Sequence, residues 1–337
     1  MPAVLCAMHD PGGALALAPV LRLVPPGWAD VFAGEWARDM LRRQGVAARP
    51  LHKDVSPQEA EALLDGCAAQ ALLTATSWGG DAEQALRNAA RRRRLPSVTV
   101  LDFWSNYRMR FRHADVPIES MPDLICVMDE GTRQEMIGEG FAASRLVVTG
   151  QPHLEALFAD GCAPACGPTD RLLFLSQPDL ANGLTVHGDS LMRRIFQEAG
   201  RMASARGRRM HLFFKPHPKE TPPAPERLRV LCDPDLVEVT LLSRTMPLLA
   251  ALDGVEAAVG GPTMGLFEAR ARGVGATALC AVNATPALVA ALRQAGIRVQ
   301  QPPACPGIFE HETNAPPAKW RPGAARRILD AVTRSMG

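Results

Sequence analysis

Residues 212–218 read Leu-Phe-Phe-Lys-Pro-His-Pro, and the rest of the chain is best interpreted from this stretch. Its opening apolar run is typical of a buried strand. Pro216 and Pro218 cannot donate hydrogen bonds to a neighbouring strand, so the strand ends there. Lys215 and His217 are then fixed at the carboxyl end of a strand, where open α/β sheets bind their ligands. A cation and an imidazole at that place suit an anion, most simply a phosphate or diphosphate.

A second stretch of the same kind follows later in the chain. Residues 255–259 are mostly apolar and continue into Gly-Gly-Pro-Thr-Met-Gly-Leu-Phe-Glu. This pattern predicts a strand beside that of the first stretch, a glycine turn, and a helix with Thr263 at its N-cap. The first helical turn, with Met264 and Gly265, would offer free N–H groups and the helix dipole to an anion. Glu268 could accept hydrogen bonds from two ribose hydroxyls; the alternative is a carboxylate on a helix surface.

The composition is that of an ordinary globular protein. The 337 residues suffice for two domains, with 47% hydrophobic and 21% charged residues. A net charge of +2 gives no indication of nucleic-acid binding, and the single Tyr argues against a base-stacking surface. We see neither a membrane-spanning segment nor a signal peptide, so we expect a cytoplasmic protein. Of the eight cysteines only Cys162 and Cys166 lie close together, and their spacing is not a usual zinc pattern.

Predicted strands and helices alternate along the whole chain in two blocks. The apolar runs that predict strands lie within residues 2–8, 28–32, 71–74, 97–101, 123–128, 146–149, 172–176, 212–218, 237–241, 255–259 and 276–280. The pattern favours an α/β fold with two Rossmann-like domains that face a cleft. We expect the first domain over residues 1–160 and the second over 168–318, with a Gly- and Pro-rich linker between them. Residues 319–337 would form a helix that returns toward the first domain.

The first predicted strand ends in a further candidate site. The sequence continues His-Asp-Pro-Gly-Gly-Ala over residues 9–14. Gly12 and Gly13 would let a ligand approach the backbone closely. His9 and Asp10 stand where a catalytic group would face the predicted cleft, although His9 could simply brace the turn. The turn matches neither the dinucleotide-binding fingerprint nor the P-loop.

The loop after residues 97–101 mixes aromatic residues with cations. Asp102, Trp104, Asn106 and Arg108 belong to it. Such a loop at a strand end can stack on a sugar ring and pair with acidic groups. The alternative is an amphipathic loop that packs over the edge of the domain.

The two blocks and the two stretches of the second block resemble the nucleotide-binding fold of GT-B glycosyltransferases. The resemblance points to bacterial polysaccharide enzymes: sialyltransferases, Kdo transferases and glycerophosphotransferases of the CDP-glycerol type. UDP-N-acetylglucosamine 2-epimerases share the same architecture. As a fold the resemblance covers the whole chain, but as motifs it covers only the Lys-Pro-His-Pro stretch and the later glycine turn.

The resemblance implies a role for each candidate residue. Asp10 or His9 would be the general base that deprotonates an acceptor hydroxyl. The acceptor or sugar would be faced by Gly12 and Gly13 and by Asp102, Trp104, Asn106 and Arg108 of the later aromatic loop. The residues that would hold the donor nucleotide and its phosphates are Lys215, His217, Thr263, Met264, Gly265, Glu268 and Ser176. These groups would stabilise the departing nucleotide, so we expect neither a metal nor another cofactor.

The sequence departs from the resemblance in two places. Epimerases carry His-x-Glu-Ala-Gly after a strand of the first domain, whereas residues 102–105 here read Asp-Phe-Trp-Ser, which argues against epimerase chemistry. Glycerophosphotransferases carry Ser-Ser in the later turn, whereas this chain has Pro262 and Thr263. We expect a glycosyltransferase that uses a nucleotide sugar and a glycan or glycoconjugate acceptor, with no nucleic-acid partner. An epimerase-like enzyme and a non-catalytic nucleotide-binding protein are the alternatives; attachment to a membrane surface and the oligomeric state stay open.

Overall fold

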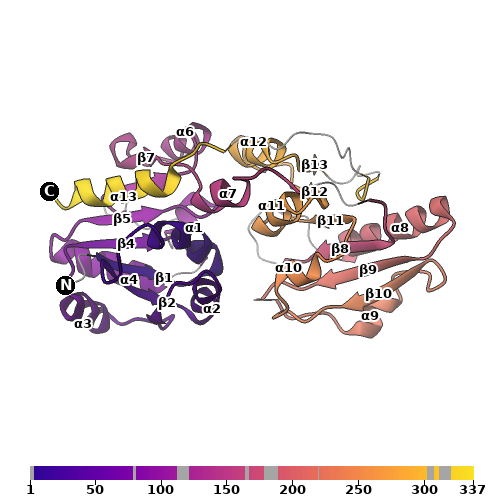
Figure 1. Ribbon diagram of the computed structural model, residues 1–337, viewed down its shortest axis with the longest axis horizontal. Helices are drawn as coiled ribbons and strands as arrows, with labels where there is room; N and C mark the ends of the chain where they lie inside the picture. The colour runs from indigo at the N-terminus through magenta and orange to yellow at the C-terminus, as the bar shows by residue number, and fades with distance from the viewer. Residues whose placement is uncertain are drawn as a thin grey trace. The chain divides into compact units, whose positions relative to one another are not determined.

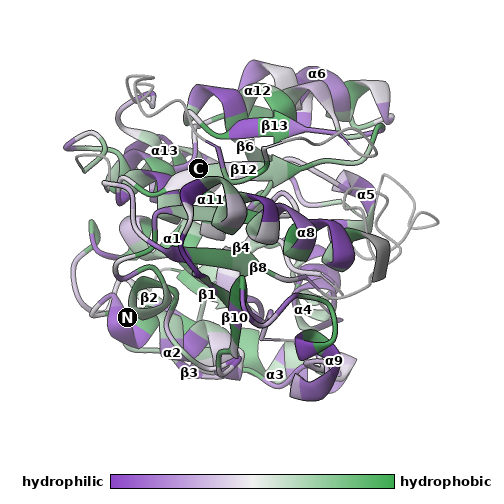
Figure 2. Cartoon of the chain, turned by 90° about the vertical axis from the view of Figure 1, so that its right-hand side faces the viewer, coloured by the Kyte–Doolittle hydropathy of each residue, from purple (hydrophilic) through white to green (hydrophobic). Residues whose placement is uncertain are grey.

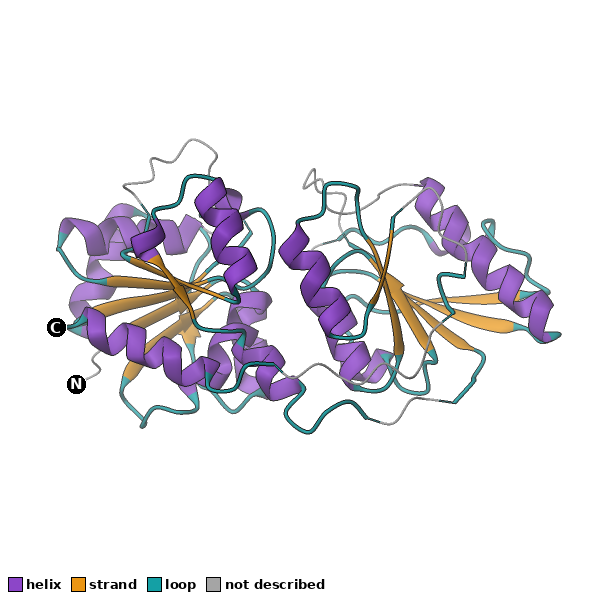
Figure 3. Cartoon of the chain, turned by 90° about the horizontal axis from the view of Figure 1, so that it is seen from above, coloured by secondary structure: helices purple, strands orange, loops and turns teal. Residues whose placement is uncertain are grey.

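The computed structural model divides into two compact units, each an α/β sandwich (Figure 1). Unit 1 comprises Met1–Ala159 and Trp320–Gly337, and unit 2 comprises Asp160–Lys319. The structure describes residues 4–78, 81–111, 121–163, 167–177, 189–218, 220–301, 307–310 and 320–337. In each unit helices pack on both faces of a parallel sheet (Figure 3). None of the helices in these ranges is both long enough and apolar enough to cross a lipid bilayer.

Unit 1 is built on a parallel sheet of seven strands in the order β3-β2-β1-β4-β5-β6-β7. The strands are β1 Val4–Met8, β2 Ala29–Ala33, β3 Arg49–Pro50, β4 Ala71–Ala75, β5 Ser97–Val100, β6 Leu124–Val127 and β7 Leu146–Val148. The helices are α1 Pro11–Leu21, α2 Glu35–Arg43, α3 Pro57–Cys67, α4 Asp81–Arg92, α5 Tyr107–Arg110, α6 Glu130–Gly138, α7 Pro152–Leu157 and α13 Ala324–Ser335. A 3-10 turn, Ala143–Arg145, precedes β7.

The inner strand β1 of unit 1 buries both of its faces, because consecutive side chains of a strand point to opposite sides. Val4 and Cys6 of β1 pack into the apolar cluster that contains α1 and α13. Leu5 and Ala7 pack into the opposite cluster, which contains α3 and α4. A strand with two buried faces reads as a continuous apolar run, and this is why the sequence pattern finds it. Figure 2 shows the same distribution, with hydrophobic strands beneath helices that also carry hydrophilic residues.

The C-terminal helix α13 belongs to the core of unit 1. Ile328 and Val332 are fully buried in the cluster on the α1 face of the sheet. The carboxylate of Glu155 accepts hydrogen bonds from the amides of Gly323 and Ala324, so it satisfies free N–H groups at the start of α13. Arg327 Nε donates to the carbonyl oxygen of Thr149 at 2.8 Å. The last segment of the chain is therefore held by capping and by burial together.

Unit 2 is built on a parallel sheet of six strands in the order β10-β9-β8-β11-β12-β13. The strands are β8 Arg171–Leu175, β9 Met210–Lys215, β10 Val237–Leu241, β11 Ala257–Gly260, β12 Gly275–Leu279 and β13 Arg298–Gln300. The helices are α8 Asp189–Arg206, α9 Pro225–Arg229, α10 Leu248–Ala251, α11 Met264–Ala271 and α12 Pro286–Gln294. The prediction that the strands of the two key stretches adjoin is wrong, because β8 lies between β9 and β11.

Several short elements have no counterpart in the sequence-based prediction, among them β3, β13 and the helices α5, α7 and α9. The edge strands β3 and β13 are only two and three residues long and carry Pro or Arg, so they show no apolar run. The short helix α7 starts at Pro152, shortly after the last strand of unit 1. A proline at the first helical position is favourable, since its fixed backbone angle suits a helix start.

Gly260 at the end of β11 lies close to the backbone of β8, and a substitution there tests this packing. A Cβ atom there would lie 2.6 Å from the carbonyl oxygen of Leu175. We expect Gly260→Ala to destabilise the fold by about 1–3 kcal/mol through overpacking, as measured by denaturant unfolding. Gly200 of α8 is the matched control, because its nearest atom would be 4.0 Å away. Gly200→Ala should stabilise the helix by roughly 0.5–1 kcal/mol, and an equal effect of the two changes would contradict the packing argument.

Candidate functional site

The turn after β1 holds His9 and Asp10 as a side-chain pair. His9 Nδ1 lies 3.0 Å from Asp10 Oδ1, and Asp10 Oδ2 accepts the backbone N–H of Trp78 at 2.9 Å. An ionised carboxylate only accepts hydrogen bonds, so the proton of this contact belongs to Nδ1. Nε2 of His9 is then the basic nitrogen of the ring. The arrangement is that of an oriented general base at the carboxyl end of a strand.

Gly12 lies against a carboxylate of the protein itself. A Cβ atom at Gly12 would be 2.6 Å from Asp102 Oδ2, and one at Gly13 would be 2.6 Å from the Cβ of Ala75. The sequence predicts glycines here because a ligand would approach the backbone. In the structure, both glycines are needed by the close packing of α1 on the ends of β4 and β5.

Asp102 is held by hydrogen bonds from three other residues at this edge of unit 1. Its Oδ1 accepts from Thr76 Oγ1 and from Arg110 Nη1, each at 2.5 Å. Gln151 Nε2 donates to the backbone oxygen of Asp102 at 3.1 Å. The sequence-based prediction names Asp102 but none of its three partners. Arg110 lies within the predicted loop, so the mixture of aromatic residues and cations was the available signal for it.

The loop after β5 is packed, as one of the two alternatives for it anticipated. The ring of Trp104 is fully buried, lies 6.1 Å from the ring of Trp320, and donates through Nε1 to Asp129. Asn106 has a left-handed backbone, with φ of 54°, at the start of α5. Arg108 Nε is buried with no hydrogen-bond partner in the described part of the chain. The buried Trp104 ring is part of the core of unit 1.

In unit 2 the lysine of the Lys-Pro-His-Pro stretch lies against backbone carbonyls. Lys215 Nζ donates to the oxygens of Pro216 and Arg244 at 3.1 and 3.0 Å, and only 7% of the residue is exposed. This burial lowers the pKa of the ammonium from its ordinary value. The charge is thus held at the end of β9 by the loop that follows β10.

Glu220 organises the turn after β9, and the sequence-based prediction missed it. Its Oε1 accepts from Ser176 Oγ at 2.6 Å, and its Oε2 accepts from the backbone N–H of His217 at 3.0 Å. The backbone N–H of Glu220 returns a bond to the carbonyl of His217 at 2.9 Å. One carboxylate therefore ties the ends of β8 and β9 together. An acid just after the second proline was its only signal in the sequence.

The glycine turn after β11 leads into α11 with Thr263 at the N-cap, as predicted. The hydroxyl of Thr263 makes no capping hydrogen bond, so the cap is formed by the backbone alone. A Cβ atom at Gly265 would lie 3.1 Å from both Leu175 Cδ1 and Leu248 Cδ2, so this glycine serves packing. Met264 and Glu268 are half-buried residues of α11, in its first and second turns.

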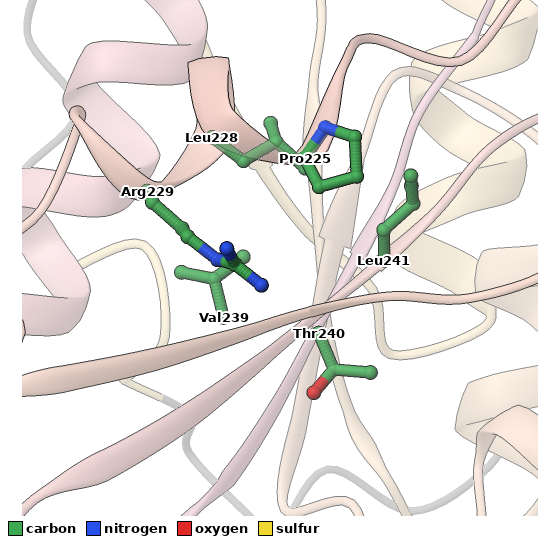
Figure 4. A pocket seen from close by; sticks show the side chains of 6 residues that line it. All are labelled: Pro225, Leu228, Arg229, Val239, Thr240 and Leu241. Carbon is green, nitrogen blue, oxygen red and sulfur yellow. The ribbon is translucent and has the colours of Figure 1, made fainter.

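A surface cavity of about 250 Å³ lies elsewhere in unit 2 (Figure 4). The residues that line it come from α9 and from the edge strand β10: Pro225, Leu228, Arg229, Val239, Thr240 and Leu241. None of the predicted site residues is among them. Within the described ranges, no group of three or more His, Cys, Asp or Glu side chains is arranged to hold a metal ion.

Both units have a Rossmann-like α/β architecture, and solved structures of low sequence identity share this two-unit fold. MnaA of S. aureus, solved with UDP, has this fold with a TM-score of 0.66 and 12% identity, over 99% of this chain and 96% of that one. UDP-GlcNAc 2-epimerase of Neisseria meningitidis, solved with UDP-GlcNAc, has a TM-score of 0.65 and 13% identity, over 98% and 99%. MurG of Acinetobacter baumannii has a TM-score of 0.55 and 13% identity, over 99% and 100%. No protein-family model matches the sequence, and no curated protein matches it.

The role of Glu220 can be tested by its removal. Glu220→Ala deletes two hydrogen bonds to a carboxylate, so we expect a loss of about 1–3 kcal/mol in the free energy of unfolding. Chemical denaturation of the full chain measures it. Glu226, an exposed residue of α9, is the control: Glu226→Ala should change stability by less than about 0.5 kcal/mol. Equal small effects would mean that Glu220 does not hold the turn.

Proposed function

We propose that the protein is a glycosyltransferase that moves a sugar from a nucleotide donor to an acceptor hydroxyl. The observation that carries this proposal is the contact of His9 Nδ1 with Asp10 Oδ1 at the carboxyl end of β1. A general base is what an acceptor hydroxyl needs in order to attack an anomeric carbon. The two-unit fold is shared with enzymes solved with UDP and with UDP-GlcNAc, which supports a nucleotide sugar as the donor.

In the proposed reaction, Nε2 of His9 takes the proton of the acceptor hydroxyl, and the hydroxyl oxygen attacks the anomeric carbon of the donor sugar. The bond from that carbon to the terminal phosphate oxygen breaks, and the nucleotide leaves as an anion. Asp10 stabilises the imidazolium that forms. The roles of Asp102 and its loop toward the acceptor stay predictions.

The donor nucleotide is assigned to the carboxyl edge of the sheet of unit 2. The first turn of α11, from Thr263 to Gly265, would provide backbone N–H groups and the positive end of the helix dipole to the phosphates. His217 and Ser176 would complete the polar lining, and Glu268 would accept the ribose hydroxyls. Lys215 would contribute its charge from the base of the loop. The half-buried position of Glu268 in α11 is compatible with this role.

A UDP-GlcNAc 2-epimerase-like reaction is the second candidate. MnaA aside, several of the solved structures with this fold are named as 2-epimerases. Asp10 and Asp102 also place two carboxylates at one edge of unit 1. The missing His-x-Glu-Ala-Gly stretch disfavours this candidate.

Nucleotide binding is the first experiment. We expect one compound of a panel with UDP, CMP, CDP, GDP and dTDP groups to raise the melting temperature of the full chain. A ligand at 100 times its Kd adds about 2.7 kcal/mol to the stability of the native state. His217→Ala and Glu268→Ala should lose the shift, whereas His9→Ala should keep it. Without any shift at millimolar concentrations, a non-catalytic protein with another ligand becomes the better description.

Product analysis then separates the two enzymes. With the nucleotide sugar found above, a transferase releases free nucleotide only when an acceptor glycan is added. An epimerase instead inverts C2 of the sugar without any acceptor. His9→Ala should lower kcat of the transfer by about 10²–10⁴-fold, because it removes the base but not the donor site. Unchanged turnover in His9→Ala would remove His9 from the reaction.

A further inference from the structure

A buried carboxyl group lies directly behind the turn that carries His9. Glu83 of α4 is 1% exposed, and its Oε1 accepts the backbone N–H of His9 at 2.7 Å. The two residues are distant in sequence, so this bond ties α4 to the end of β1. The reaction proposed above gives Glu83 no role.

Few groups around Glu83 would stabilise a negative charge on its carboxyl group. Its Oε2 is buried and has no hydrogen-bond partner within the described ranges. Arg87, one turn further along α4, makes no ion pair with it among the described residues; its Nη2 donates to Gln84 and its guanidinium lies 5.5 Å from the ring centre of Phe111. The charged groups that face Glu83 are therefore Arg87 from its own helix and Asp10, with its partner His9, from the β1–α1 turn.

Burial at this site favours the protonated form. It raises the pKa of Glu83; the backbone hydrogen bonds and the charge of Arg87 oppose this, and the charge of Asp10 makes the smallest contribution, which also raises the pKa. An unpaired buried charge costs far more than a neutral polar group. A neutral carboxylic acid can still accept the N–H of His9 through its carbonyl oxygen, so it keeps the observed hydrogen bond.

We propose that Glu83 is a positioning residue: its buried carboxyl group accepts the backbone N–H of His9 and so keeps the imidazole against Asp10, and because its Oε2 is buried without a hydrogen-bond partner in the described ranges, it does this as the neutral acid. Its importance for turnover rests on the function proposed for His9, but its protonation and its hydrogen bond do not. A neutral group is suited to this place, because an anion behind His9 and Asp10 would add a second negative charge beside the pair.

Infrared spectroscopy of the full chain tests the protonation directly. A protonated carboxylic acid has a carbonyl stretch distinct from that of a carboxylate, and we expect such a band at neutral pH in the wild type and its loss in Glu83→Gln. Glu130 of α6 is the matched control, because hydrogen bonds from Gln134 and Arg133 lower the pKa of this exposed carboxyl group. Glu130→Gln should leave the band intact. If the wild type has no such band at neutral pH, or if Glu83→Gln keeps it, Glu83 is ionised and the proposal is wrong.

The pH dependence of unfolding gives a second readout. Because the pKa of Glu83 is raised in the folded state, the native protein keeps a proton that the unfolded chain releases above pH 4.5, the ordinary value. Stability is therefore lost as the pH rises from there through the raised native value. Glu83→Gln should remove this loss. The melting temperature of the variant, measured relative to that of the wild type, should therefore increase as the pH rises. Parallel profiles of the two proteins would contradict the proposal.

Hydrogen exchange tests the positioning role. Gln at position 83 keeps an acceptor oxygen, whereas Met fills similar space without one. We expect the amide of His9 to exchange at least tenfold faster in Glu83→Met than in Glu83→Gln, with the amides of Leu5 and Cys6 in β1 unchanged as internal references. Equal exchange at His9 in both variants would overturn the role. These measurements use no substrate, so they stand even if the transferase assignment fails; turnover that is reduced in Glu83→Met and retained in Glu83→Gln would link them to catalysis.

Discussion

The contact between Gly12 and the carboxylate of Asp102 fixes the carboxyl edge of the first sheet. A Cβ atom at position 12 would lie 2.6 Å from Asp102 Oδ2, so any other residue there would have to displace this carboxylate. This closeness sets where the turn of His9 and Asp10 leaves β1, since the helix follows that turn at once. Thr76, Arg110 and Gln151 then hold Asp102 from three other segments. Segments that are distant in sequence are thereby joined through one residue, by its carboxylate and its backbone oxygen.

Both units use one acidic residue to hold strand ends together by hydrogen bonds. In each, an acidic side chain collects donors from the ends of neighbouring strands: Asp102 in unit 1 and Glu220 in unit 2. Carboxylates suit this task because each oxygen accepts more than one hydrogen bond. The cation of Lys215 is placed differently, against backbone carbonyls. Fixed networks of this kind keep a site in shape before any ligand arrives.

Most of the fold could be predicted from the sequence, because doubly buried strands such as β1 and β9 appear as apolar runs that end in glycine or proline. The edge strands β3 and β13 could not, since short exposed strands carry no such pattern. Candidate site residues such as His9 and His217 could be predicted because their ionisable side chains directly follow an apolar strand pattern. Their supports were not found: Glu83 and Glu220 act through contacts that no local pattern encodes.

The assignment of α13 to unit 1 has a consequence for how the chain folds during synthesis. The helix supplies Ile328, Ala331 and Val332 to the cluster that covers one face of the first sheet. These residues leave the ribosome after all of unit 2. The part of that apolar face above β4, β5 and β6 therefore lacks the cover of α13 while the second sheet is being made. Chaperone binding during translation should concentrate on this nascent first unit, although it emerges before unit 2.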